Sequence, residues 1–158
     1  MDRTILKLLV VTFCFVFGGV SFAEDAPNLT SPLGYWKTID DISGKPRSII
    51  YISENQNSLQ GKVVQIFPRP GHTIHDVCTE CKGENSNKPI LGMTILKNLQ
   101  ASESQWQNGE ILDPANGKTY KCNIRLTDNG KHLNVKGYIG IPLFGRSQTW
   151  ERVSGVKA

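Results

Sequence analysis

The chain has 158 residues and a formal net charge of +4 at pH 7, with 39% hydrophobic and 20% charged residues. This length suits one domain with its own hydrophobic core. The lysine and arginine residues are scattered along the chain, which argues against a nucleic-acid-binding protein, because such a protein needs basic residues clustered on one face.

The amino terminus has the pattern of a secretory signal peptide. Arg3 and Lys7 give a basic start, residues 8–17 are apolar, and small residues follow up to Ala23. The apolar stretch is too short to remain as a membrane-spanning helix. We therefore expect a signal peptide over residues 1–23 that is cleaved near Ala23. The mature protein would be periplasmic or secreted, and no later segment is apolar enough to span a membrane.

After the predicted cleavage site, residues 24–33 are polar and contain proline, and we expect a flexible lead-in there. One β-rich domain follows over residues 34–154, as short apolar runs separated by turn signals. The expected strands cover residues 34–40, 47–54, 59–67, 109–114, 119–127, 132–140 and 147–153. Residues 89–100 are ambiguous, because they fit a strand that runs into a helical turn.

Alternation within residues 119–127 predicts which side chains are buried. Tyr120, Cys122 and Ile124 alternate with polar residues, which places Cys122 on the buried face of a strand. The Asn129-Gly130 pair that follows is a strong hairpin signal. Seven or eight short strands without a convincing amphipathic helix predict an all-β fold, either a β-sandwich or a single up-and-down antiparallel β-barrel. Closure removes exposed sheet edges and favours the barrel.

The long irregular segment 68–88 contains four potential ligands at every third position, namely His72, His75, Cys78 and Cys81. A local Cys78–Cys81 disulfide is favoured, because an exported protein meets an oxidising compartment. The buried Cys122 is then a free thiol, although pairing of Cys122 with one of the two loop cysteines remains an open alternative.

The same four residues also allow a metal site, but ligands from one short loop differ from the two distant pairs of a zinc finger. A thiol–disulfide redox role would place the cysteines at the start of a helix, and the following residues are poor helix formers. Haem attachment would require histidine where Lys82 stands. Adjacent Asp40 and Asp41 would point to opposite faces of a strand. We therefore expect no cofactor and no resident metal, and a binding protein rather than an enzyme.

Four blocks of the chain carry a family resemblance. They are GYWKTIDDISGKPRSIIYI near residue 34, CTECKGENSNKPILGMTIL, GEILDPANGKTYKCNIRL, and VKGYIGIPLFGRSQTWERV near the carboxyl terminus. In this order they resemble the family called domain of unknown function 2147 (DUF2147), over roughly residues 33–153. The resemblance implies an exported bacterial protein, and it assigns no chemistry.

A second, shorter resemblance is to the lipocalin and calycin barrels. The segment Gly34-Tyr35-Trp36 is similar to their Gly-x-Trp motif on the first strand. In such barrels the tryptophan closes one end and a basic residue from a late strand packs over it, a part that Arg152 or Arg146 would take here. The alternative is that Trp36 and Trp150 are ordinary core aromatics.

The expected function follows from this fold. A small barrel offers a mouth for one small, mostly apolar ligand, lined by inward-facing aromatic residues. The candidates for this lining are Tyr51, Phe67, Tyr120 and Tyr138. We expect a monomer with this small hydrophobic ligand as its partner. The alternatives are a redox protein that uses Cys78 and Cys81, and a structural or interaction protein of the cell envelope without a ligand.

Overall fold

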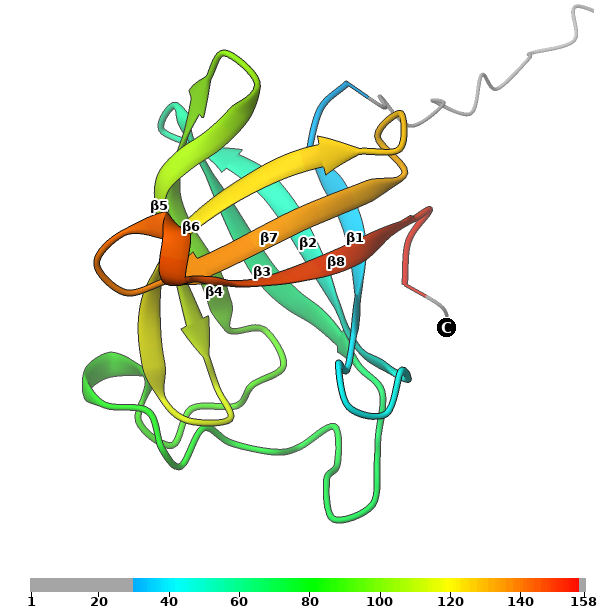
Figure 1. Cartoon of the computed structure of the whole chain (residues 1–158). Coiled ribbons are helices and arrows are strands. Elements are labelled where there is room, and N and C mark those ends of the chain that lie inside the picture. Colours follow the sequence, from blue (N-terminus) through cyan, green and yellow to red (C-terminus); the bar gives the residue numbers. More distant parts are fainter. Residues whose placement is uncertain (1–29, 157–158) are drawn as a thin grey trace, which may run out of the picture.

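The structure is a computed structural model that describes residues 30–156. Eight antiparallel strands follow one another in sequence order around a closed barrel (Figure 1). The strands are β1 Gly34–Ile39, β2 Pro46–Asn55, β3 Ser58–Ile66, β4 Thr94–Ser102, β5 Gln105–Asp113, β6 Lys118–Thr127, β7 His132–Tyr138 and β8 Arg146–Val153. Two short 3₁₀ helices, η1 Gly83–Asn85 and η2 Pro142–Phe144, lie in loops. No helix within residues 30–156 is long and apolar enough to cross a membrane.

The predicted all-β barrel is confirmed, and the sandwich alternative is wrong because β8 pairs with β1 and closes the sheet. The ambiguous segment 89–100 contains no helical turn: residues 94–102 form β4, and the residues before it belong to a loop. Strand β5 begins at Gln105, earlier than predicted, because polar side chains on its outer face hide the apolar alternation there. The predicted signal peptide over residues 1–23 lies outside the described residues.

The barrel has two different ends. The closed end carries the turns at residues 56–57, 103–104 and 128–131, together with residues 30–33. The open end carries the β1–β2 turn, the long loop 67–93, the β5–β6 turn and the β7–β8 loop. In Figure 1 the closed end is at the top and the long loop, in green, is at the bottom.

Side chains that point inward fill the barrel core. Ile50, Ile52, Leu96, Leu99 and Leu133 are fully buried, and on β2 the exposed Tyr51 alternates with Ile50 and Ile52. Bulges interrupt this alternation in several strands, for example at Asn98 and Asn108, where positive φ angles accompany shifts in register. The bulge at Asn98 lets Leu96 and Leu99, which are three positions apart on β4, both be buried.

Candidate functional site

Trp36 and Arg152 seal the closed end. The Arg152 guanidinium lies 4.3 Å from the centre of the Trp36 ring, in a cation–π contact. Trp36 is fully buried, and its indole N–H donates a hydrogen bond of 2.7 Å to the carbonyl oxygen of Pro32. The structure therefore contains the contact that the sequence suggested for Trp36 and Arg152, whereas Arg146 lies at the opposite, open end.

Arg152 also ties two backbone segments to β8, namely residues 31–33 and the β6–β7 turn. Its side-chain nitrogens donate hydrogen bonds to the carbonyl oxygens of Ser31 at 2.6 Å, Gly130 at 2.7 Å and Leu33 at 3.0 Å. Burial lowers the pKa of Arg152, although not enough to remove its charge. Residues 31–33 are thus held against the barrel and are not part of the flexible lead-in expected for residues 24–33.

Large side chains occupy the middle of the barrel. A Cβ atom added at Gly109 would lie 2.4 Å from Cγ of Leu99, and one added at Gly61 would lie 2.9 Å from Cδ1 of Leu96. The glycines are therefore required by the close approach of these leucines, and a bound molecule cannot reach the closed end without displacing them. Trp150 and Trp36 fill the space beyond, so that any interior site is confined to the open end.

Four adjacent strands, β5 to β8, each place one half-buried residue on the inner face at the open end. These residues are Ile111, Tyr120, Gly137 and Gln148. A Cβ atom added at Gly137 would lie 3.4 Å from Cγ2 of Ile111 and 3.6 Å from Cβ of Tyr120, so these three residues are neighbours. Cys122 is fully buried one step deeper on β6 and forms part of the floor. We call Ile111, Tyr120, Gly137 and Gln148 the open-end site.

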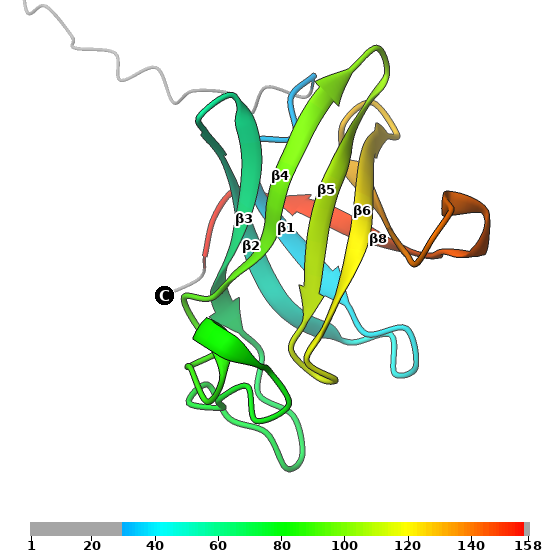
Figure 2. The ribbon, with the colours of Figure 1, turned by 90° about the vertical axis from the view of Figure 1, so that its left-hand side faces the viewer.

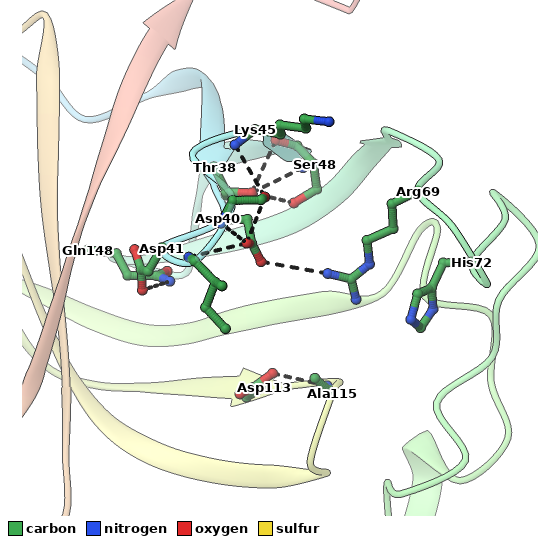
Figure 3. A network of polar contacts seen from close by, with 12 residues as sticks. Thr38, Asp40, Asp41, Lys45, Ser48, Arg69, His72, Asp113, Ala115 and Gln148 are labelled. Carbon is green, nitrogen blue, oxygen red and sulfur yellow. Dashed lines mark hydrogen bonds and ion pairs between the residues drawn. The ribbon is translucent and has the colours of Figure 1, made fainter.

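A polar network borders this site. The Gln148 side-chain amide donates to the Asp41 carboxylate at 2.9 Å, as Figure 3 shows, and Arg146 pairs with the same carboxylate. The Gln148 amide oxygen accepts a hydrogen bond of 3.4 Å from the Trp150 indole N–H. The hydrogen bond from Gln148, with a further contribution from Arg146, lowers the pKa of Asp41. Asp41 is therefore ionised at neutral pH and fixes the orientation of Gln148.

On the other side of the open end, Thr38 is buried and its hydroxyl lies 2.8 Å from that of Ser48 (Figure 3). The adjacent Asp40 accepts hydrogen bonds from the backbone and side chain of Ser43, which lower its pKa. Asp40 also lies 3.7 Å from Arg69 of the long loop. Asp40 and Asp41 follow the end of β1 and do not lie within a strand as expected, and their side chains contact different segments, Asp40 the β1–β2 turn and Arg69, Asp41 the start of β8.

The structure contains the predicted Cys78–Cys81 disulfide, which lies within the long loop and packs against the β5–β6 turn of the barrel. Cys78 is fully buried, with its Sγ 3.3 Å from the carbonyl oxygen of Pro114 in the β5–β6 turn. Gly117 of the same turn meets the backbone of Glu80 so closely that a Cβ atom there would lie 1.9 Å from the Glu80 oxygen. The disulfide is therefore a packing element between the loop and the barrel wall.

These cysteines are poorly placed for redox chemistry. The disulfide sulfurs are shielded from solvent, because Cys81 is only 4% exposed and Cys78 is fully buried. Cys122 is the free cysteine within residues 30–156, and burial raises the pKa of its thiol to about 12. Almost no reactive thiolate is present at neutral pH.

The two loop histidines do not combine with the cysteines into a ligand set. The His72 ring lies 2.7 Å from the Asp76 carboxylate, and its hydrogen bond contributes to lowering the pKa of Asp76 after that from the Thr73 backbone. Within residues 30–156, no group of three or more His, Cys, Asp or Glu side chains is arranged to hold a metal ion.

The four aromatic residues predicted to line the barrel interior lie in four different environments. Tyr120 points into the open-end site, and its hydroxyl accepts a hydrogen bond of 3.1 Å from Asn116. Tyr51 lies on the outer wall, where it is 39% exposed and makes a tilted ring contact with Tyr35, with 4.7 Å between the ring centres. Tyr138 also faces outward but is covered by the β7–β8 loop. Phe67 is half-buried just after β3. Tyr51 and Tyr138 therefore do not line the interior as expected.

Sequence reasoning did not identify Gly137, Ile111, Gln148 and Asp41. The inward position of Gly137 could have been predicted, because the alternation that buries Leu133 and Val135 continues to this glycine.

Two hollows on the outer surface were also not predicted. One, of about 940 Å³, lies between β3, β4 and the 83–94 segment, and the other, of about 600 Å³, lies over β5 to β8.

The comparisons with known proteins agree with this architecture. A solved structure, protein HP1028 from the human pathogen Helicobacter pylori, is described as belonging to the lipocalin family. It superposes with a TM-score of 0.68 at 19% sequence identity, over 79% of this chain and 84% of that chain. At this identity the likeness shows the fold alone. No curated protein matches the chain.

The family model described as "Uncharacterized protein conserved in bacteria (DUF2147)" matches residues 34–152, which cover every strand of the barrel except the last residue of β8. The match therefore takes in the closed-end pair Trp36 and Arg152 as well as the open-end site. The chain belongs to this bacterial family of uncharacterized proteins, DUF2147, and has the closed eight-stranded barrel of a lipocalin-like fold.

Proposed function

We propose that the protein is a non-catalytic binding protein of the cell envelope that holds one small ligand at the open end of its barrel. The observation that carries the proposal is the open-end site, where half-buried inward residues from four adjacent strands lie above a buried floor. In a barrel of this size, a mouth of this kind suits one small molecule. Residence in the envelope rests on the signal-peptide pattern at residues 1–23.

The chemistry of the site defines the ligand class. Ile111 and the Tyr120 ring offer apolar contact, whereas the Gln148 amide and the Tyr120 hydroxyl offer hydrogen bonds. The leucines beside Gly61 and Gly109 limit the depth. We infer a small, mostly apolar molecule that carries one polar group.

A filled site tests the proposal. Gly137 is not among the glycines with positive φ, so that valine is compatible with its backbone, and the valine methyl groups would project between Ile111 and Tyr120. We expect the wild type to enhance the fluorescence of the apolar probe N-phenyl-1-naphthylamine. Gly137→Val should bind the probe at least tenfold more weakly. Gly155→Val is the matched control, because nothing lies within 4 Å of a Cβ atom at Gly155.

Native mass spectrometry of the exported wild type should show a co-purified small mass that Gly137→Val lacks. Circular dichroism of both valine variants checks that the barrel is intact. Wild-type protein that binds neither the probe nor a co-purified molecule, or equal probe binding by a folded Gly137→Val, would refute the proposal.

A further inference from the structure

Among residues 30–156, the β7–β8 loop carries the largest group of exposed apolar side chains. Leu143 and Phe144 in η2 are 77% and 79% exposed, and Ile139 and Ile141 are 72% and 54% exposed. No charged residue occurs between Lys136 and Arg146. Single exposed apolar residues are ordinary, whereas four within six positions of one loop are not.

The base of the β7–β8 loop packs on the barrel wall, whereas its tip extends away from it. At the base, a Cβ atom added at Gly145 would lie 2.9 Å from Cβ of Tyr138, so that the returning chain lies directly on this tyrosine. The Tyr138 hydroxyl is 3.4 Å from the side-chain oxygen of Asn123 on the neighbouring strand. Beyond this base the loop extends away from the barrel wall, as Figure 2 shows in orange. The apolar tip is therefore convex and held out from the barrel.

A basic hollow lies at the foot of the same loop. It measures about 600 Å³, and Pro142 of the loop lines it together with Arg125 and Lys136. Amide side chains, including Asn123 and Asn134, complete the wall, and the described residues that line it include no carboxylate. Within residues 30–156 neither Arg125 nor Lys136 has an ion-pair partner. Two unpaired cations and several amide donors suit a phosphate group.

We propose that this face docks on an anionic phospholipid surface, with the loop tip among the acyl chains and a lipid phosphate in the hollow. Apolar side chains next to basic groups are the features of interfacial membrane binding. The four side chains expose on the order of 500 Å², since a large apolar residue presents roughly 150–250 Å². A stable protein dimer buries roughly 800 Å² per partner. The exposed area is therefore smaller than a stable dimer needs. A second copy of the chain would also need a surface complementary in shape to the tip, whereas fluid lipid adapts to it.

This inference concerns the outer wall and is independent of ligand binding at the open-end site. Its test is sedimentation of the wild-type protein with vesicles of phosphatidylglycerol and phosphatidylcholine, compared with phosphatidylcholine alone. We expect binding to the anionic vesicles that weakens steeply with salt. The double variant Leu143→Ser/Phe144→Ser and the double variant Arg125→Gln/Lys136→Gln should each lose at least tenfold in affinity.

Two controls match these variants. Ile42→Ser removes an apolar side chain that is 97% exposed on another loop, and Lys62→Gln removes an exposed cation from β3. Both should bind as the wild type does, and probe binding at the open-end site should be unchanged in all variants. The proposal is overturned if the wild type ignores anionic vesicles or if the controls lose as much affinity as the test variants. It is also overturned if the loop instead mediates a concentration-dependent dimer, or if inorganic phosphate alone binds at Arg125 and Lys136 and vesicles add nothing.

Discussion

Replacing Arg152 by methionine tests how the barrel is closed. Methionine keeps an unbranched apolar stem, but it removes three hydrogen bonds to backbone carbonyls and the charge over Trp36. Because the guanidinium is half-buried, each hydrogen bond is counted at about 1 kcal/mol, below the usual range for charged donors. The cation–π contact adds about 0.5–1 kcal/mol. We therefore expect Arg152→Met to lower the free energy of unfolding by about 3–4 kcal/mol.

Urea denaturation followed by tryptophan fluorescence measures this loss, with stability taken from the midpoint and slope. Arg146→Met is the matched control: its side chain is 70% exposed and pairs only with Asp41, so that its loss should be at most about 1 kcal/mol. Arg152→Lys should recover only part of the stability, since an ammonium group cannot reach three carbonyls in the guanidinium geometry. A loss below about 1 kcal/mol for Arg152→Met would refute the claim that this residue fastens the closed end.

The remaining predictions concern the loop staple, a tight turn and the buried thiol. Replacing Cys78 and Cys81 together by serine should lower the free energy of unfolding by about 2 kcal/mol in a urea titration, since the disulfide closes only a short loop. Gly117→Ala should cost more than about 2 kcal/mol, because its φ is +67° and the backbone of the disulfide loop fills the Cβ position. Gly140→Ala, with a φ of +75° and open space around it, should cost only about 1 kcal/mol, and equal losses would contradict this comparison. The Cys122 thiol stays protonated in the folded state until about pH 12, whereas in the unfolded chain it ionises near its ordinary pKa of 9.0. Its contribution to stability is therefore complete below pH 9 and falls as the pH rises toward 12, so Cys122→Ala should show a smaller alkaline loss in urea titrations from pH 8 to pH 11.

The sequence predicted the features that depend on local pattern. The hairpin signals and the alternation in residues 119–127 placed Cys122 correctly on the buried face. The Gly-x-Trp segment at residues 34–36 also allowed the contact between Trp36 and Arg152 to be predicted. A closed barrel pairs its first strand with its last strand, and this pairing brings the two residues together.

The orientation of the aromatic side chains, into or out of the barrel, was predicted less well. Tyr51 stands in the run of residues 49–52, where four consecutive apolar residues give no alternation, and a bulge between Ile49 and Ile50 shifts the register. Tyr138 faces outward by the alternation of its own strand, yet it is buried, because a loop from the same hairpin folds over it. Residue type alone misled the prediction at both positions.

Contacts between distant loops escaped prediction altogether. Asp41 and Gln148 are 107 positions apart, and only the closure of the barrel brings them together. The seating of the disulfide against the β5–β6 turn likewise depends on how the long loop folds back along the outer wall. Such contacts arise from tertiary packing, which short-range patterns do not encode.

The most direct test of the open-end site is to locate a bound molecule by NMR. Titration of ¹⁵N-labelled protein with N-phenyl-1-naphthylamine should shift the backbone amide signals of Ile111, Tyr120, Gly137 and Gln148. Amide signals at Asn85 and Asn98, in the outer hollow beside β3 and β4, should remain in place. Shifts confined to the outer wall, or no shifts at saturating probe, would contradict ligand binding at the open end of the barrel.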